Sequence, residues 1–435
     1  FPRINALSLW LFWAGILMAL MTFFVTDKPD VMWTGYPPYS VSTTANTALY
    51  VFTVHLIGFS SILGAVNFLV TIIYMRAPGM GWNQMNIFVW TTFAAFMIQI
   101  VFVPVLASAV TLLLFDKYLG TGFFDPTRGG DVLLYQNLFW FYSHPAVYVI
   151  FLPAVGLLFD IIATQARNHV FNYKACVYGG IIGILAITGE VWIHHLYIAG
   201  MPDWLRIGMM VSTLLISVPV GLLLISLWGT MYKGAIHYNI SMWYAVVCLF
   251  LILVGGLTGI PLAVTSMTVH LSETSFVHAH FHFIMGLMAT FAVFAAVYHW
   301  FPKMFGRSAD NSVAKIALWI KVIGTQVTFW PLFIIGVQGM PRRYWDYSMY
   351  PQFEVYHQVA TAGAGLIAIG VILMIGGWIY SAFYGPKVGT NPWRSKSLEW
   401  THTESPPGPG NFPKPVTVDQ YWTPYNYIEW DHDKY

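Results

Sequence analysis

Long apolar runs recur along this chain, and they limit its possible folds more than any other feature of the sequence. A run of roughly 18 or more apolar residues is a candidate transmembrane helix. Such runs lie at about 7–25, 49–74, 87–115, 133–159, 176–198, 207–230, 242–265, 275–300, 313–337 and 359–380. Only 9% of the 435 residues are charged, whereas soluble domains carry about 25%. The sequence therefore predicts an all-α, polytopic membrane helix bundle of about ten transmembrane helices.

The last part of the chain has a different composition. From Trp393 onward the sequence is polar and contains SPPGPGNFPKP at 405–415, and proline-rich segments of this kind are extended. We therefore predict that residues 1–385 form the transmembrane bundle. Residues 386–435 are predicted to form an extended polar tail that lies on the bundle or on a neighbouring protein.

The loops on one side of the predicted bundle carry most of the positive charge. That side takes the tail and Arg3, Arg76, Arg167, Lys174, Lys233, Lys303 and Arg307. The cations of the other side, Lys28, Lys117, Arg128 and Arg206, each have aspartates nearby. Because cytoplasmic loops are enriched in Lys and Arg, we expect the first side and both termini to face the cytoplasm or the mitochondrial matrix. No Lys/Arg stripe alternates with aromatic residues, so we exclude nucleic acid as a partner.

Histidines gather in three of the predicted helices. Ionisable residues inside a membrane are costly and are functional candidates by default. The histidines are His144, His194, His195, His280 and His282. At ~1.5 Å per residue, His144 would lie roughly 15 Å below the outer boundary and the others somewhat shallower, so all five share one layer. A single buried histidine, such as His55, is more often a satisfied core residue. Five in one layer would leave many imidazole nitrogens without partners, which favours metal binding.

The spacing of these histidines suggests two kinds of ligation. His194 and His195 point about 100° apart on an ordinary helix, so they can share a metal that lies between them, with His144 as a third ligand. Imidazole suits copper, iron and zinc, and three nitrogens with an open position suit a catalytic metal. His280 and His282 project to nearly opposite faces of their helix. One helix could therefore provide axial ligands to two different haems.

Several longer motifs extend this pattern along nearly the whole chain. They are FPRINALSLW, FFDPTRGGDVLLYQNLFWFYSHPAVY, WIHH, AHFHF, YHWFPKMFGR, GMPRRYWDY and SLEW. Their content and order resemble subunit I of the haem-copper oxidases, the catalytic subunit of cytochrome c oxidase. The resemblance implies two haems of the a type and one copper.

The resemblance also implies a role for each histidine of the pattern. His144, His194 and His195 would hold the copper. His280 would be the proximal ligand of the oxygen-reactive, high-spin haem, and His282 one axial ligand of the low-spin haem.

Other site residues follow from the same resemblance. Tyr148 matches the tyrosine that family members cross-link to the copper histidine, and it would supply an electron and a proton. Phe281 would lie between the haems, and Trp192 is expected at the cofactor site. Arg342 and Arg343 match the pair that binds the haem propionates through charge-assisted forks.

The resemblance further implies partners. The chain has no dicopper thiolate motif, so electrons from a cytochrome c-type donor would enter through a subunit II-like protein docked on the outer face. Subunit III-like membrane subunits are expected as well. The membrane would be the inner membrane of a bacterium or a mitochondrion.

The sequence departs from the family pattern at its start and in the proton pathways. A typical member has about two helices before the position of Phe1, and the second low-spin haem ligand lies there. The sequence is therefore expected to be one half of a split subunit, with the first two helices on a separate chain, or an incomplete chain; loss of the low-spin haem is disfavoured because His282 is present. Of the proton pathway that begins near this motif, Asn5 remains. The glutamate after His-Pro is replaced by Ala146, and Tyr142-Ser143 fits the substitute that one branch of the family carries.

Three further departures concern other sites. The lysine of the second proton pathway is replaced by Leu223 and its hydroxyl companion by Val220, so this pathway is absent or relocated. The outer metal site has Ser272-Glu273 in place of His-Asp, so that Glu273 is a possible Mg²⁺ ligand. Glu190, one turn before His194, is either a hydrogen-bonded structural carboxyl or a proton donor or oxygen ligand near the copper-site metal.

Two enzyme functions remain open from the sequence. In the first, O2 is reduced to water with coupled proton translocation, which Tyr148 and Tyr142-Ser143 favour. In the second, two NO molecules are reduced to N2O, as in nitric oxide reductases, which Leu223 and Glu190 favour. A third reading, a haem-binding assembly subunit without catalysis, predicts lost metal ligands, yet every ligand that this chain could contain is present.

Overall fold

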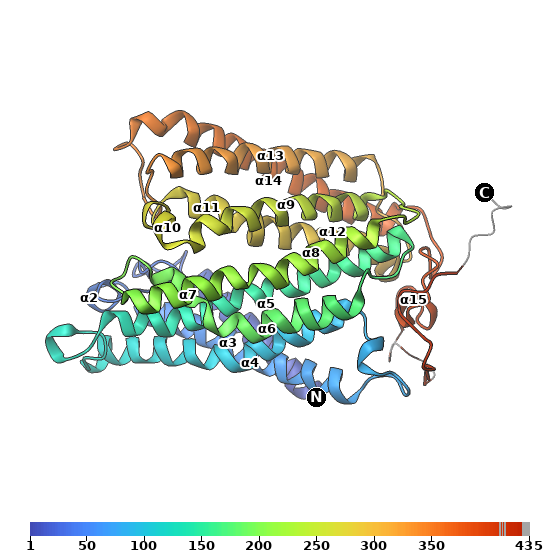
Figure 1. Cartoon of the computed structure of the whole chain (residues 1–435), viewed down its shortest axis with the longest axis horizontal. Coiled ribbons are helices and arrows are strands. Elements are labelled where there is room, and N and C mark those ends of the chain that lie inside the picture. Colours follow the sequence, from blue (N-terminus) through green and yellow to red (C-terminus); the bar gives the residue numbers. More distant parts are fainter. Residues whose placement is uncertain (409, 411, 413–414, 429–435) are drawn as a thin grey trace. The chain divides into compact units, whose positions relative to one another are not determined.

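The computed structural model describes residues 1–408, 410, 412 and 415–428, and this part of the chain is built from helices without a β-sheet (Figure 1). The longer helices are α1 (Pro2–Met21), α3 (Thr47–Tyr74), α4 (Ile87–Leu114), α5 (Val132–Ala166), α7 (Asp203–Leu215), α8 (Ser217–Met231), α9 (Ile240–Ala263), α12 (Met288–Phe305), α13 (Ser312–Val337) and α14 (Glu354–Tyr384). The shorter ones are α2 (Tyr39–Ser42), α6 (Ile182–Ile187), α10 (Thr265–Leu271), α11 (Ser275–Phe281) and α15 (Leu398–Thr401).

Short π and 3-10 turns join or extend several of these helices. The π turns are η2 (Phe115–Leu119), η4 (Ala175–Ile181) and η7 (His282–Leu287). The 3-10 turns are η1 (Trp82–Gln84), η3 (Pro126–Arg128), η5 (Thr188–Glu190), η6 (Trp192–Leu196) and η8 (Pro351–Phe353). Because π turns occur often at functional sites, the turn that begins at His282 is of particular interest.

The predicted membrane bundle is confirmed. Among the described residues, nine helical segments are long and apolar enough to cross a membrane. The run expected at 176–198 is the exception, since it is divided into η4, α6, η5 and η6. Gly179, Gly180, Gly183 and Gly189 lie in this run, and glycine is about 1 kcal/mol less favourable than alanine in a helix interior. This segment is apolar enough to lie in a membrane, but its backbone changes from π to α to 3-10 geometry along its length.

Asparagine side chains start several of the membrane helices. The side-chain oxygens of Asn46, Asn86, Asn239 and Asn311 each accept a hydrogen bond from a backbone N–H three residues later, at 2.9 to 3.1 Å. The first N–H groups of a helix have no partner within it, and asparagine is among the best residues for this cap. The chain therefore fixes where α3, α4, α9 and α13 begin.

Contacts within the chain divide it into two compact units, each described here by itself. The first unit comprises Phe1–Arg76, Thr92–Val149 and Leu185–Thr213, and the second comprises Ala77–Thr91, Ile150–Ile184 and Leu214–Tyr435. In the first unit α1 packs along α3, where the hydroxyls of Ser8 and Ser60 each donate to the other residue's carbonyl at 2.8 and 2.7 Å. The core of this unit is rich in aromatic side chains, among them Phe124, Tyr135, Phe139, Trp140 and Tyr197.

In the second unit the helices α9, α12, α13 and α14 pack together, and the tail lies on this unit. The hydroxyl of Tyr425 donates to Asp160 Oδ1 at 2.9 Å and accepts from the backbone N–H of Ile87 at 2.7 Å. Gln84 binds two tail carbonyls, and Trp400 is only 2% exposed. Burial also raises the pKa of the Glu399 carboxyl. The described tail therefore packs on the chain itself, while a domain boundary at residue 385 stays a prediction, and residues 429–435 lie outside the described part.

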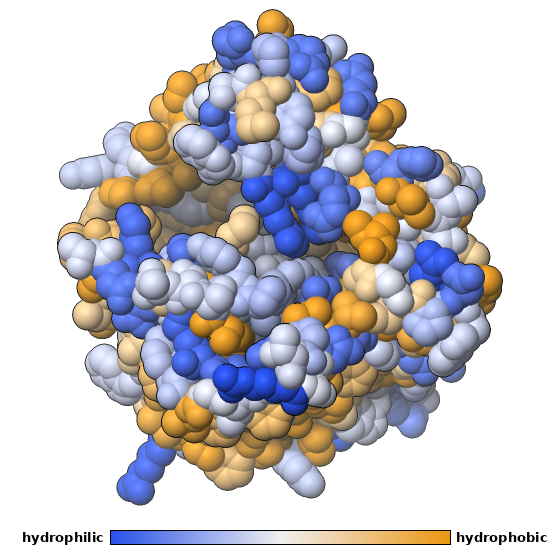
Figure 2. All heavy atoms as spheres, turned by 90° about the vertical axis from the view of Figure 1, so that its left-hand side faces the viewer, coloured by the Kyte–Doolittle hydropathy of each residue, from blue (hydrophilic) through white to orange (hydrophobic). Residues whose placement is uncertain are grey.

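The helices expose large apolar side chains along their length and polar residues at their ends. On α1, for example, Leu9, Trp10 and Leu17 are all more than half exposed. Figure 2 looks onto the helix ends at the left of Figure 1 and shows hydrophilic residues gathered there. This pattern is typical of helices that meet lipid along their sides and water at their ends.

Replacing Gly336 with alanine is expected to destabilise the second unit. A Cβ at this position would lie 2.1 Å from the backbone nitrogen of Phe276 on α11, so α11 and α13 would have to separate, at a cost of about 1–3 kcal/mol. Thermal unfolding of the detergent-solubilised protein measures this as a lower Tm. The matched control is Gly365→Ala on α14, where an added Cβ meets nothing within 4 Å; equal Tm values for the two variants would contradict the close approach.

Candidate metal centre

The first unit brings three of the predicted histidines together. A ring nitrogen from each of His144, His194 and His195 lies within 4.8 Å of the other two. The ring centroids are 4.3 Å apart for His194 and His195, 4.5 Å for His144 and His194, and 5.4 Å for His144 and His195. Three imidazoles at these distances can share one metal ion, and imidazole is a common ligand of copper, zinc and iron.

His144 is fixed on α5 by contacts at both of its ring nitrogens. Its Nδ1 lies 3.2 Å from Nε2 of His195, and its Nε2 lies 2.8 Å from the hydroxyl of Tyr148, one turn later on the same helix. Both side chains are buried. The hydroxyl of Tyr148 therefore occupies the ring nitrogen that does not face His195, which leaves Nδ1 as the ligand atom on the side of the cluster.

His194 and His195 lie on the 3-10 turn η6, whereas the sequence analysis assumed an ordinary α-helix. A 3-10 helix has three residues per turn, so adjacent side chains diverge by about 120°. Each of the two rings is therefore held in place by a contact with another helix. His195 stacks on Trp140 with centroids 3.6 Å apart and planes at 9°. His194 Nδ1 lies 3.2 Å from the Thr213 hydroxyl on α7.

The structure places the neighbouring candidates on the same elements. Trp192 on η6 donates its indole N–H to Asn137 Oδ1 at 3.2 Å and packs edge-on against Phe141. Tyr142 is half-buried and Ser143 buried on α5, in the turn before His144. Trp192 thereby links η6 to α5. The predicted roles of these three residues in cofactor binding and proton supply stay predictions.

Glu190 lies apart from the three-histidine cluster. The structure places it on η5 with an exposed side chain, and its backbone carbonyl accepts a hydrogen bond from Ser212 Oγ at 2.9 Å. Within the described residues, the group of side chains close enough to share an ion consists of His144, His194 and His195 without this carboxylate. Its position therefore gives no support to a ligand role, which remains a hypothesis from the sequence.

His280 and His282 lie in the second unit, at the junction of α11 and η7. His280 Nδ1 lies 3.2 Å from the hydroxyl of Thr258 on α9, and His282 Nδ1 lies 2.7 Å from the carbonyl oxygen of His278. Haem-ligating histidines commonly have one ring nitrogen held in this way, which fixes the tautomer and turns the other nitrogen to the metal. The ring of His282 also stacks on Phe329 at 4.7 Å. Both histidines thus fit axial ligation through Nε2.

The expected propionate-binding pair lies in the segment that follows α13, which ends at Val337. Arg342 forms a two-pronged ion pair with Glu273, with N–O distances of 3.0 and 2.9 Å. Glu273, the possible Mg²⁺ ligand, is therefore already paired with Arg342, one of the two arginines expected to bind propionates. Arg343 follows with a φ of 67°, and Phe281 on α11 is 39% exposed.

The structure also places two residues that the sequence analysis linked to proton pathways, Leu223 and Asn5. Leu223 on α8 is 1% exposed, and a Cβ on Gly180 of η4 would lie 2.6 Å from its Cδ2. This close packing shows that the leucine fills its space. Asn5 is exposed on α1.

Residues that support the histidines were not foreseen from the sequence. Trp140, Thr213, Thr258 and Phe329 each contact a predicted ligand, as described above. Trp140 lies one turn before His144 on α5, but the ring it contacts is that of His195, so its place in the sequence gave no signal for this contact. The other three come from different helices and could be found only from the fold.

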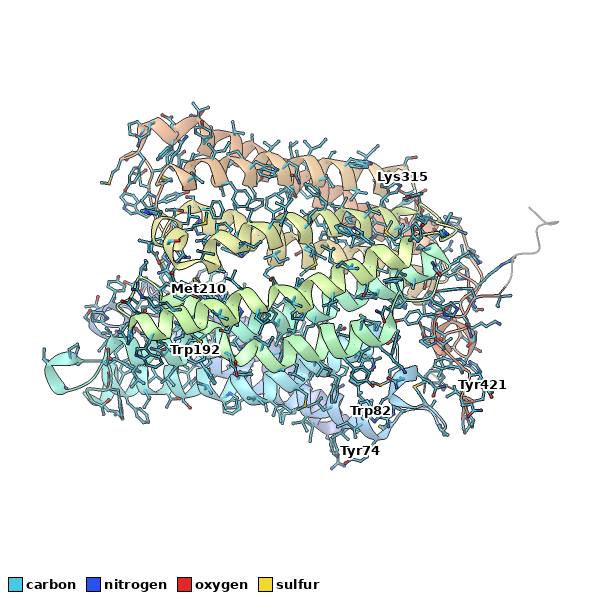
Figure 3. All side chains as sticks on the ribbon, viewed as in Figure 1. Tyr74, Trp82, Trp192, Met210, Lys315 and Tyr421 are labelled. Atoms are coloured by element: carbon cyan, nitrogen blue, oxygen red, sulfur yellow. The ribbon has the colours of Figure 1, made fainter. Side chains whose placement is uncertain are left out.

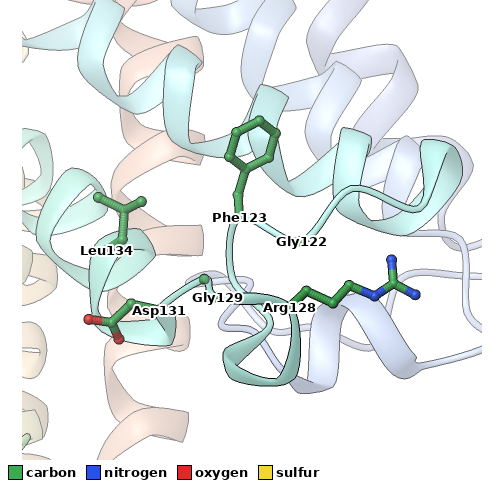
Figure 4. Close-up of a pocket in the computed structure, with 7 residues that line it drawn as sticks. Gly122, Phe123, Arg128, Gly129, Asp131 and Leu134 are labelled. Carbon is green, nitrogen blue, oxygen red and sulfur yellow. The ribbon is translucent and has the colours of Figure 1, made fainter.

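The loop before α5 contains a hollow of about 400 Å³ that none of the predicted site residues lines. Its walls are Gly122, Phe123, Arg128, Gly129, Gly130, Asp131 and Leu134. In Figure 4 the side chains of Arg128 and Asp131 point in opposite directions, and Arg128 is paired with Asp125 instead, at 3.5 Å. We assign this hollow no part in the metal centre.

Comparison with known proteins identifies the family. Residues 1–366 match the family described as Cytochrome C and Quinol oxidase polypeptide I. The chain belongs to this family. Cytochrome c oxidase subunit 1 of Thermostichus vulcanus is 40% identical over 94% of this chain and 73% of its own length. The subunit 1 of Cereibacter sphaeroides is also 40% identical over 94% and 73%, and the alternative cytochrome c oxidase subunit 1 of Bradyrhizobium diazoefficiens is 34% identical over 98% and 75%.

A solved haem-copper terminal oxidase dimer has the same fold. It aligns with a TM-score of 0.70 at 20% identity, covering 89% of this chain and 71% of that chain. Together with the relatives, this makes the protein an integral membrane haem-copper oxidoreductase and the catalytic subunit of a terminal oxidase. The cofactors of the family are haem and copper, and the donor sets described above fit both.

Removing one cluster histidine is expected to abolish metal binding at the cluster. His144→Ala and His195→Ala would each leave two imidazoles, and the metal content of the purified protein should fall by about one ion per chain as measured by mass spectrometry. His55→Gln is the matched control, because both ring nitrogens of His55 are occupied by Val51 and Thr111 in the same unit. Retention of the full metal content in His144→Ala would contradict the cluster as a metal site.

Thr258→Val is expected to change the haem bound through His280. The substitution removes the hydroxyl at Nδ1 and leaves the Gly255 backbone as the other hydrogen-bond partner of the ring. With one partner fewer the imidazole becomes a weaker donor to iron, so the haem reduction potential should rise. A spectroscopic redox titration measures this shift. Thr290→Val serves as the control, since this exposed hydroxyl bonds only its own helix at Gly286. An unchanged potential in Thr258→Val would show that the hydroxyl does not act on the ligand.

Proposed function

We propose that this chain reduces O2 to water at a haem-copper centre, with electrons from a cytochrome c-type donor and with coupled proton translocation. The observation that carries the proposal is the 2.8 Å contact between Tyr148 and His144 beside the other two cluster histidines. Reduction of O2 to two waters consumes four electrons and four protons. A phenol held against a metal ligand is a local source of one of each.

Each side chain has a defined task in this proposal. His144, His194 and His195 hold copper, and His280 and His282 are axial ligands of two haems of the a type. When bound, these groups supply the electrons and the coordination of O2. The protein sets their polarity and proton supply. Burial of Tyr148 keeps bulk water from its hydroxyl. The phenol proton is therefore not exchanged with bulk water and stays available for O2 reduction.

In the second unit, which carries His280 and His282, the ion pair of Arg342 and Glu273 fixes one arginine. Two parallel N–H···O bonds hold the guanidinium in a fixed direction. In this arrangement Arg342 and Arg343 are positioned to meet haem propionates. A Mg²⁺ ion at Glu273 would have to replace the guanidinium, so we regard this carboxylate first as the partner of Arg342.

The relatives suggest the partners and the location. Their names as cytochrome c oxidases favour a cytochrome c-type donor and an electron-entry subunit resembling subunit II, with further membrane subunits resembling subunit III. We place the protein in a bacterial or mitochondrial inner membrane with its termini inside, and we assign proton supply on the cluster side to Tyr142, Ser143 and Asn5.

Reduction of NO to N2O is the second candidate function. The buried Leu223 favours it, because a leucine cannot carry the protons that O2 reduction needs. The exposed position of Glu190 gives the other argument no support, and the named relatives are oxidases. We therefore hold O2 as the substrate and look elsewhere for proton supply.

The test is the turnover of the purified complex with O2 and with NO, in the wild type and in Tyr148→Phe. We expect fast O2 uptake in the wild type and a loss of about 100-fold in the variant, since one positioned proton donor contributes at least this factor. The haem spectrum should be unchanged. Tyr178→Phe is the control, because that exposed hydroxyl bonds Asn83. N2O formation with little O2 uptake by the wild type would contradict the proposal.

A further inference from the structure

The helix α13 carries a lysine in its buried middle. Lys321 is 0% exposed and lies nine residues after Ser312, which is roughly 14 Å along the helix axis. Charged side chains at such depth in a membrane helix are rare and mark functional positions by default. None of the roles described above uses this residue.

Side chains from three other helices enclose the amine of Lys321. Its Nζ lies 4.4 Å from the ring centroid of Phe294 and 5.9 Å from that of Phe291, both on α12. The ring of Tyr244 on α9 is 4.9 Å away, and Sδ of Met374 on α14 is 2.8 Å away. The amine thus lies within an aromatic cage whose members all belong to the second unit.

The cage supplies attraction to a cation without supplying an anion. In the part of the chain that the structure describes, no carboxylate oxygen lies within 4.0 Å of Nζ. The titratable groups around it are Tyr244 on α9 and, stacked on that ring at 5.6 Å, Tyr298 on α12; α14 contributes the sulfur of Met374. The carboxylate of Asp310 lies in the α12–α13 loop, where it accepts from the backbone of Ile240 at 3.2 Å.

Two opposing effects act on the protonated form of this amine. Burial in a membrane penalises the ammonium, while cation–π contacts with the surrounding aromatic rings favour it. A carboxylate partner would hold the proton on the amine, but in the described part of the chain no carboxylate lies within 4.0 Å of Nζ. We therefore expect the amine to exchange its proton.

Hydroxyl groups lie on both sides of the amine. The Tyr244 hydroxyl donates to the same Met374 sulfur at 3.6 Å, and Tyr298 continues toward the end of the helices that carries the α12–α13 loop. In the other direction, one turn along α13, Thr325 is 0% exposed and its hydroxyl has no hydrogen-bond partner among the described residues. A buried hydroxyl of this kind is a place where an ordered water binds.

We propose that Lys321 is a proton-exchange residue of this oxidase. A proton enters from the α12–α13 loop, past Tyr298 and Tyr244, and forms an N–H bond with the lone pair of Nζ. The N–H bond breaks when the proton passes to the oxygen of a water bound at the Thr325 hydroxyl, and no electrons are transferred. The inference rests on the proposed oxidase function, which consumes these protons, and it supplies on α13 what Leu223 cannot supply on α8.

Two substitutions in the full complex separate proton exchange from packing and from charge. Lys321→Met keeps an apolar side chain of similar length, and Lys321→Arg keeps a cation that does not lose its proton. We expect O2 turnover to fall at least tenfold in both, with the haem spectrum and metal content unchanged. Wild-type turnover in Lys321→Met would overturn the proposal, and so would wild-type turnover in Lys321→Arg, because a fixed charge would then suffice.

Controls come from the same helix. Lys315, labelled in Figure 3, is exposed near the start of α13, and Lys315→Met should leave turnover unchanged. Thr325→Val removes a hydroxyl while preserving shape, and it should slow turnover several-fold without a further effect when it is combined with Lys321→Met. If both Lys321 variants lose haem, Thr325→Val decides, since wild-type turnover there would overturn the proposal.

The same experiment distinguishes this inference from the proposed function. A wild-type complex that does not reduce O2 would contradict the oxidase function itself. If the wild type reduces O2 and Lys321→Met has the same O2 turnover, only the role of Lys321 is contradicted.

Discussion

Every imidazole nitrogen that this chain places among its membrane helices needs a partner, and much of the structure serves that need. Water cannot provide the partner inside a bilayer, and an unsatisfied polar group there costs several kcal/mol. At His280 and His282, a threonine hydroxyl and a backbone carbonyl take one nitrogen each. At the three-histidine cluster, the nitrogens face one another, Tyr148 and Thr213. Among these five histidines, the remaining nitrogens are those that fit metal ligation. His357 on α14 is the exception to the rule, since its buried Nε2 has no hydrogen-bond partner among the described residues.

The helix forms around these histidines follow the same constraint. His194 and His195 lie on a 3-10 turn, and His282 begins a π turn. Both forms are less stable than an α-helix, so tertiary contacts such as the stack of His195 on Trp140 must hold them. The cost of burying polar groups also bears on where protons can pass. Leucine occupies the expected position on α8, and the buried cation lies instead on α13 within aromatic rings.

The sequence predicted the membrane bundle from the local signal of its apolar runs, and the histidine cluster from the shared membrane depth of its members and from the family resemblance. Apolar runs gave nine of the spans, and the position of His144 relative to Tyr148 gave their contact. The broken segment between Ala175 and Leu196 was not foreseen, since hydropathy does not register backbone form. Glu190 was expected near the cluster because it lies one turn before His194 on an ideal helix, and the 3-10 geometry removes that relation. Lys321 could have been found by applying the rule for buried charges to lysine as well as to histidine.

The most direct test of this account is the identity of the metal held by His144, His194 and His195. X-ray absorption at the copper and iron edges of the purified complex reports which metal has three imidazole ligands without a haem. We predict copper with three nitrogen neighbours from the protein. Non-haem iron with an additional carboxylate oxygen would contradict the oxidase account and would restore Glu190 as a ligand.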